Sequence, residues 1–133
     1  MSNTLDRIRH LLVIAFDIAM KSGHRCKHCA LVVQRGGKVV GKGYNRCLGK
    51  KNGRNSYHAE KQALMHNCLK KDLKGADLIV VRINTSLKNL HEVDVETGNL
   101  NEIFCNSKPC KMCTTMIEKC QTEYGLRNVY YTT

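Results

Sequence analysis

The chain has 133 residues, 42% of them hydrophobic, which fits a single globular domain that needs no disulfide bonds to fold. Lysine and arginine number 22 against 11 acidic residues, a formal net charge of +11, and this excess favours an anionic partner such as a nucleotide or nucleic acid. No apolar run approaches the ~20 residues of a membrane span, and no secretory signal follows the N-terminus. We therefore expect a cytoplasmic or nuclear protein that is neither secreted nor held in a membrane.

The N-terminal third of the sequence predicts one helix and a pair of strands. Apolar residues from Leu5 to Met20 recur at helical spacing, and Ser22-Gly23 ends this helix. Residues 30–35 form an apolar run typical of a buried strand, and residues 38–45 follow as the returning strand. Because Gly36-Gly37 between them is typical of a tight turn, we expect an antiparallel hairpin.

The rest of the sequence predicts helices that alternate with strands. Residues 84–107 are polar and irregular, and we interpret them as an insertion in which a hairpin could form. The other predicted elements are a basic loop at 46–56, a second helix that begins near His58 and carries Ala59, Ala63, Leu64 and Leu69, an apolar strand at 76–83, a third helix from Pro109, and a terminal strand at 128–132.

This order of elements, α-β-β-α-β-α-β, predicts one α/β domain over residues 1–133. The first two strands are expected to be antiparallel, and the later strands join through crossover helices. The sheet is therefore expected to be mixed, with helices on both of its faces, in a three-layer α-β-α architecture.

Two short motifs carry the chemistry. His58-Ala59-Glu60 begins the second helix, so His58 and Glu60 can both project from its first turn toward one pocket. Cys110 and Cys113 share one face of the third helix, whose N-terminus favours thiolates. One imidazole and two thiolates leave one position of a tetrahedral zinc ion open, which is typical of catalytic zinc. Glu60 would then move protons rather than bind the metal.

With Pro109 before the cysteines, the H-A-E and P-C-x-x-C motifs resemble the zinc signature of the cytidine/deoxycytidylate deaminase superfamily. The predicted order of elements is also similar to that of the family. The resemblance implies a cytidine-deaminase-like fold with a four-stranded sheet of order 2-1-3-4. It also implies a zinc-dependent hydrolase that converts a cytosine-type base to uracil and releases ammonia. In that enzyme His58, Cys110 and Cys113 bind Zn²⁺, and Glu60 is catalytic.

The resemblance implies further contacts with the substrate. Asn45, at the end of the second strand, matches a family asparagine that touches the sugar or base. The backbone groups of Ala59 and Ser107 lie where family members hydrogen-bond the base and its amino group. Two structural alternatives stay open, because Asn45 is also a common turn residue and Ser107 could cap the third helix.

Basic residues close to both motifs favour contact with phosphate. The loop before the second helix carries Lys50, Lys51 and Arg54 near Tyr57, a combination that suits phosphate contact and base stacking. Lys108 flanks the metal cysteines and would add positive potential at the mouth of the pocket. The alternative is a solvated basic loop with no ligand.

The sequence also departs from some family members. The first metal ligand is His, where small tetrameric cytidine deaminases use Cys, so the resemblance favours the deoxycytidylate, tRNA-adenosine, guanine and APOBEC-type branches. On charge grounds we expect deoxycytidylate or cytosine in single-stranded DNA or RNA, with tRNA adenosine or guanine as alternatives. Most relatives continue beyond a fourth strand, and here the last strand would leave an open edge. We expect a second copy of the chain to cover it in a homodimer.

A second cluster, Cys26, His28 and Cys29, has two interpretations: ligands of a second, structural zinc ion, or buried thiols with no metal. A rival interpretation joins Cys26 and Cys29 with Cys110 and Cys113 in one closed structural site. The remaining alternative to an enzyme is a non-catalytic, zinc-stabilised domain that binds nucleic acid. Such a domain would hold zinc without turnover.

Overall fold

The computed structural model describes residues 8–23, 26–47 and 56–133, and of Cys47, Ser56 and Tyr57 it describes the backbone only. Leu5 and the loop residues Lys50, Lys51 and Arg54 lie outside this part. In chain order the elements are α2 (Arg9–Ala19), β1 (His28–Val33), β2 (Val39–Tyr44), β3 (Arg46–Cys47), β4 (Ser56–Tyr57), α3 (Ala59–Lys61), η1 (Gln62–His66), η2 (Lys70–Leu73), β5 (Asp77–Ile83), η3 (Leu90–Glu92), α4 (Leu100–Ile103), β6 (Phe104–Cys105), α5 (Lys111–Tyr124) and β7 (Val129–Tyr131).

The main sheet is mixed, as the sequence predicts. β1 pairs antiparallel with β2 on one side and with β5 on the other. The second edge of β5 is divided, because β7 pairs parallel with residues 78–80 and β6 pairs antiparallel with residues 82–83. The order β2-β1-β5-β7 matches the predicted order 2-1-3-4. The predicted count of four strands is wrong, since β6 is a fifth strand that arises within the segment interpreted as an insertion.

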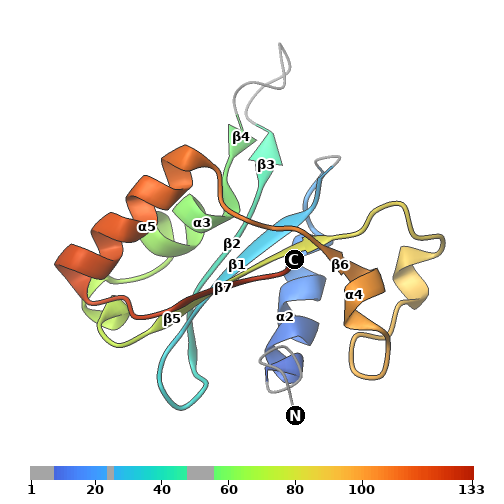
Figure 1. Ribbon diagram of the computed structural model, residues 1–133, viewed down its shortest axis with the longest axis horizontal. Coiled ribbons are helices and arrows are strands. Elements are labelled where there is room, and N and C mark those ends of the chain that lie inside the picture. The colour runs from blue at the N-terminus through green and yellow to red at the C-terminus, as the bar shows by residue number, and fades with distance from the viewer. Residues whose placement is uncertain (1–7, 24–25, 48–55) are drawn as a thin grey trace.

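Helices cover both faces of this sheet, which confirms the three-layer architecture. Figure 1 shows α2 on one side of the sheet and α3 with α5 on the other. Side chains along β1 alternate between the two faces of the sheet. Cys29, Leu31 and Val33 pack into the apolar cluster under α2. Ala30 and Val32 face the opposite cluster, which includes residues of η1 and α5.

The second and third helices begin close to their predicted positions but differ in length and form. α3 has one regular turn and continues as the π-helical turn η1, which ends at His66. Leu69 therefore does not belong to this helix, and it is 61% exposed. α5 begins at Lys111 with Cys110 as its N-cap residue, so Pro109 precedes the helix instead of occupying its first turn.

The segment 84–107 contains no hairpin, contrary to one sequence interpretation, and folds as η3, α4 and β6. Val95, Leu100 and Ile103 are buried in the cluster under α2. The Arg9 guanidinium also donates hydrogen bonds of 3.0 Å to the carbonyl oxygens of Val95 and Gly98. Most of the segment is thus part of the α2 layer, and its last residues reach the functional site described below.

Two glycines of β2 allow the α3 segment to lie directly on the sheet. A Cβ at Gly43 would lie 2.5 Å from the Ala59 carbonyl oxygen, and a Cβ at Gly41 would lie 2.7 Å from the Ala63 carbonyl oxygen. A side chain at either position would push the helix away from β2. The pattern Gly41-Lys42-Gly43 therefore helps to set the height of α3 above the sheet.

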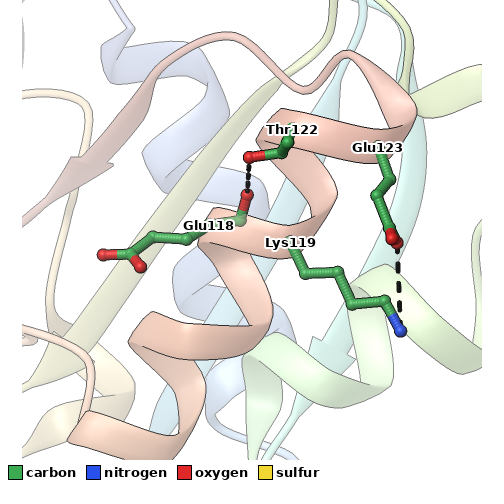
Figure 2. A network of polar contacts seen from close by, with 4 residues as sticks. All are labelled: Glu118, Lys119, Thr122 and Glu123. Atoms are coloured by element: carbon green, nitrogen blue, oxygen red, sulfur yellow. Dashed lines mark hydrogen bonds and ion pairs between the residues drawn. The ribbon is translucent and has the colours of Figure 1, made fainter.

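The outer surface of α5 is polar (Figure 2). The Thr122 hydroxyl donates a 2.9 Å hydrogen bond to the Glu118 carbonyl oxygen, and Lys119 Nζ lies 3.9 Å from Glu123 Oε2. The inner surface of α5 buries Cys113, Ile117 and Cys120. Among the described residues, none of the helices has the length and apolar character needed to cross a lipid bilayer.

Candidate active site

The two predicted metal motifs meet where two helices begin. His58 is the N-cap residue of α3, and Cys110 is the N-cap residue of α5. Cys110 Sγ lies 3.9 Å from His58 Nδ1. Cys113, in the first turn of α5, is buried, and the ligand atoms of the three residues lie within 4.8 Å of one another. The structure thus confirms that helix starts far apart in sequence meet around one point.

Glu60 is buried beside these three residues. Only 6% of the residue is exposed, and burial raises the pKa of its carboxyl above the ordinary value. Its own backbone N–H, His58 and the Cys113 thiol lower the pKa, but burial is the largest influence. A carboxyl whose proton affinity is raised in this way suits a group that accepts a proton and then returns it.

The three donors fit a zinc ion. Two ligands of tetrahedral zinc, each 2.0–2.3 Å from the metal, are about 3.5 Å apart, close to the separation of Cys110 Sγ and His58 Nδ1. Several influences raise the pKa of the Cys113 thiol. Burial is the largest of them, and the nearby Glu60 is another. A divalent cation at this point would ionise the thiol and compensate for its burial. No fourth protein ligand joins the group within the described residues, so one coordination position is left for a non-protein ligand.

A cavity of about 320 Å³ opens next to this cluster. Its lining combines two of the metal-binding residues with Glu60 and with four of the residues predicted to contact substrate. The full lining comprises Cys26, His28, Asn45, His58, Ala59, Glu60, Arg82, Asn106, Ser107, Lys108 and Cys110. The volume lies in the range of pockets that bind small molecules.

Residues 6–132 match the family described as the cytidine and deoxycytidylate deaminase zinc-binding region. The chain belongs to this family. It is therefore a zinc-dependent hydrolytic deaminase, and His58, Cys110 and Cys113 form its candidate zinc site. A search of curated proteins finds no match.

Solved structures with this fold include a viral deaminase. The dCMP deaminase of cyanophage S-TIM5, in complex with dCMP and dUMP, has a TM-score of 0.59 and 21% identity over 98% of this chain and 83% of its own. The apo form of the same enzyme has a TM-score of 0.58 and 21% identity over 98% of this chain and 84% of its own. At this level of identity the likeness establishes a shared fold.

Asn45 of the deaminase lies in the cavity wall, but its amide is already engaged by the protein. Asn45 Oδ1 accepts a 2.9 Å hydrogen bond from the His28 N–H, and Nδ2 donates one of 2.5 Å to the Cys26 carbonyl oxygen. The Ser22 hydroxyl donates to the Asn45 carbonyl oxygen at 2.7 Å. In this structure Asn45 therefore ties the end of β2 to the start of β1, and its contact with substrate stays a prediction.

Ser107 does not cap the third helix, and that interpretation is wrong. Its hydroxyl donates a 2.8 Å hydrogen bond to the Val80 carbonyl oxygen and accepts one from the Thr132 N–H at 2.8 Å. Its backbone N–H donates to the Thr132 carbonyl oxygen at 2.8 Å. Ser107 is thus held at the divided edge of β5, where it lines the cavity.

The other predicted substrate contacts have separate outcomes. Ala59 is buried in the cavity wall, and exposed Lys108 lines the same cavity. Tyr57 is the last residue of β4, directly before His58, and its side chain lies outside the described part.

The predicted second metal cluster is not assembled. Cys29 is buried under α2, whereas Cys26 and His28 line the cavity near the zinc ligands. Successive residues of a strand face opposite sides, so His28 and Cys29 point apart. Within residues 8–23, 26–47 and 56–133, His58, Cys110 and Cys113 are the one group of three potential ligands. The rival closed site of four cysteines is excluded for the same reason.

Arg82 is a cavity residue that the sequence analysis missed. It lies near the end of β5, opposite His28 in the register, and its guanidinium donates to Cys26 Sγ at 3.5 Å. A single charged residue near the end of a strongly apolar strand is the signal that could have revealed it. In β5 it faces the same side as Leu78 and Val80, which is the side of α3 and α5.

Proposed function

We propose that this deaminase acts on the cytosine of a phosphorylated nucleotide, with deoxycytidylate as the first candidate. The observation that carries the proposal is one cavity that joins zinc ligands, buried Glu60 and two cationic side chains, Arg82 and Lys108. Glu60 is the one acidic side chain among the residues that line this cavity. A similarly folded viral enzyme, solved in complex with dCMP and dUMP, supports the same substrate class.

The chemistry requires water to add at C4 of cytosine and the amino group to leave as ammonia. His58, Cys110 and Cys113 would hold the zinc ion, which would act as a Lewis acid and lower the pKa of the attacking water. Glu60 accepts the proton that the water gives up. It gives this proton to the ring nitrogen. It then accepts the second proton from the hydroxyl now on C4 and gives it to the departing amine, so that the C4–N bond breaks and a carbonyl and ammonia are the products.

The protein's own groups would orient the base and the phosphate. Ala59 and Ser107 line the cavity, and their backbone groups would form hydrogen bonds to the ring edge and amino group. Arg82 offers a planar fork of donors that matches a phosphate, and Lys108 offers a flexible positive charge at the opening. Asn45 would act mainly as a positioning residue, because it holds the segment 26–28 in the wall.

The experiment that tests this proposal is ammonia release by the zinc-loaded protein. The substrates are dCMP, deoxycytidine, adenosine, guanine and short DNA and RNA oligomers that contain cytosine. We expect the highest kcat/KM for dCMP. Deoxycytidine that reacts as well as dCMP would contradict the role of phosphate, and absence of turnover on every substrate would favour the non-catalytic alternative.

Two substitutions locate the phosphate contact. Arg82→Gln and Lys108→Gln should each lower kcat/KM for dCMP about tenfold to a hundredfold, the scale of a lost hydrogen bond to a charged group, and should change deoxycytidine less. Lys88→Gln removes the same charge from an exposed residue outside the cavity and is the matched control. Preferred turnover of an oligomer, or of adenosine or guanine, would assign the substrate to one of the alternative branches.

The homodimer remains a prediction for this enzyme. Among the described strands β7 pairs with β5 alone, and its other side is the edge that a second copy would cover. Analytical ultracentrifugation of the zinc-loaded protein measures the oligomeric state directly.

A further inference from the structure

A second cavity lies at the end of the sheet opposite the zinc site. The zinc-site cavity includes His28 at the start of β1 and Arg82 near the end of β5. The second cavity, of about 580 Å³, is lined by residues that follow β1 and precede β5 and β7. β1 has six residues, so the two ends of the sheet are roughly 15–20 Å apart. We call the second cavity the hairpin pocket, and it is lined by Gln34, Arg35, Gly36, Lys38, Lys74, Gly75 and Arg127.

The hairpin pocket gathers four cations and no acid. Arg35, Lys38, Lys74 and Arg127 line it, and all four are exposed. Within the described part of the chain, the charged groups of these four residues make no ion pair, side-chain hydrogen bond or ring contact. Like charges held in one concave surface repel one another, and a bound anion would relieve that repulsion.

Asp72 and Asp77 form hydrogen bonds with residues of the loops around the pocket. Asp72 Oδ1 accepts a 3.5 Å hydrogen bond from the Gln34 amide, and Asp77 Oδ1 accepts one of 3.1 Å from the Asn128 N–H. Neither carboxylate lines the pocket. They brace the loops beside it, and the four cations of the lining outnumber these two charges.

Backbone hydrogen bonds fix the three loops that form the pocket. Gly75 N–H donates to the Gly125 carbonyl oxygen at 2.8 Å, and Arg127 N–H donates to the Ala76 carbonyl oxygen at 2.7 Å. The Gln34 N–H closes the β1–β2 hairpin on the Lys38 carbonyl oxygen at 2.8 Å. The four cations are thus carried by segments whose backbones are already in place, which lowers the entropic cost of binding.

We infer that the hairpin pocket is a second phosphate-binding site, which takes a chain of phosphates such as a nucleic-acid backbone or a polyphosphate group. Four cations that line one pocket match several phosphate charges better than one. The pocket has no aromatic lining residue on which a base could stack, so we expect it to bind the phosphates and not the base. This site is separate from the cavity of the proposed deaminase reaction and does not depend on it.

The test compares two charge-reversed proteins with the same net charge. The first is Arg35→Glu with Arg127→Glu, and the control is Lys21→Glu with Lys88→Glu on exposed residues outside both cavities. Binding of inorganic triphosphate, and of a fluorescent single-stranded oligonucleotide between 50 and 200 mM salt, is measured for each. We expect the first variant to bind about tenfold more weakly or worse, with a salt slope reduced by about 0.7 for each lost contact, and the control to lose much less.

Further variants distinguish binding at the hairpin pocket from binding at the active site. Glu60→Gln and Arg82→Gln should retain the binding, and the hairpin-pocket variant should retain zinc and deamination of its small substrate. Competition between triphosphate and oligonucleotide would identify a polyphosphate group as a sufficient ligand, whereas binding of the oligonucleotide alone would identify the nucleic-acid backbone. Equal losses in the two charge-reversed proteins, or wild-type protein that binds neither probe, would overturn the inference.

Discussion

The two faces of the sheet differ in what holds them together. The layer between α2 and the sheet is a continuous apolar cluster that includes Leu12, Phe16 and Phe104, and the two rings meet edge to face at 6.3 Å. The layer under α3 and α5 is also apolar at its centre, but it ends at a site with buried Glu60 and the zinc ligands. The face under α2 therefore chiefly stabilises the domain, and the face under α3 and α5 also positions the residues of the active site. Substitutions on the two faces should separate these roles.

The largest effect is expected at the zinc ligands. Cys113→Ser should remove most of the bound zinc, abolish deamination and lower the melting temperature, because metal binding is coupled to folding. Cys120→Ser changes another buried thiol of the same helix that is not a ligand, and it should retain zinc and activity. Metal analysis and thermal unfolding, with and without a chelator, measure both effects. Full zinc content in Cys113→Ser would refute the ligand assignment.

The next largest effect concerns Glu60. Glu60→Gln should keep the zinc ion and the fold but lower kcat by roughly 10²–10⁴, the usual contribution of a positioned acid and base. Glu118→Gln, on the exposed surface of α5, is the matched control. Single-turnover kinetics on zinc-loaded protein give the comparison. Normal turnover in Glu60→Gln would remove this residue from the mechanism.

Two fully buried leucines test the contrast between the faces directly. Leu12→Ala under α2 and Leu64→Ala in η1 should each reduce the free energy of unfolding by about 2–5 kcal/mol. The folded fraction of Leu12→Ala should keep its kcat, whereas Leu64→Ala should lower kcat because η1 continues the helix that carries Glu60. Denaturant unfolding and active-site titration separate the two readouts. Equal kcat in both variants would mean that the faces are not functionally distinct.

A smaller effect is expected where α3 rests on β2. Gly43→Ala would place a Cβ 2.5 Å from the Ala59 carbonyl oxygen, so α3 must shift, at a cost of about 1–3 kcal/mol and some loss of kcat. Gly23→Ala introduces the same methyl group where no atom lies within 4 Å and should change neither property. Denaturant unfolding and steady-state kinetics, measured on both variants, give the change in the free energy of unfolding and in kcat. Unchanged activity in Gly43→Ala would show that the spacing of α3 is not critical.

The smallest effect is expected on the outer surface of α5. Lys119 and Glu123, shown in Figure 2, are 58% and 51% exposed and 3.9 Å apart, so solvent screens their attraction. Glu123→Gln should reduce the free energy of unfolding by at most about 0.5 kcal/mol and leave kcat unchanged. A larger loss by urea denaturation would show that this helix surface has a structural role that its exposure does not indicate.

The sequence predicted the site well because its ligands have strict chemical and spacing requirements. His58, Cys110 and Cys113 were assigned from residue type and spacing together with the family resemblance, and the structure gathers them. The order of the main strands was implied by the family resemblance, and the pairing β2-β1-β5-β7 agrees with it, although β6 shares the edge of β5. Both predictions depend on local patterns that survive in a single sequence.

The features that the sequence did not reveal depend on contacts between distant segments. Ser107 forms its hydrogen bonds with Val80 and Thr132, so no local capping pattern could identify its role. Arg82 joins the active-site cavity only because β5 ends beside β1. The spacing of Cys26 and Cys29 suggested a metal site, but strand alternation sends Cys29 to the opposite face.

The divided edge of β5 has a consequence for tolerance to changes in loop length. β6 pairs with β5 at residues 82–83, so the chain comes back beside the end of β5. Residues 84–103 therefore form a loop whose two ends are held together by the sheet. Lengthening such a loop costs little entropy. Homologous deaminases could therefore gain or lose residues here while residues 106–110, and with them the zinc ligand Cys110, keep their position. We expect the length of this segment, residues 84–103, to differ between relatives, and we expect it to tolerate an inserted tag or domain.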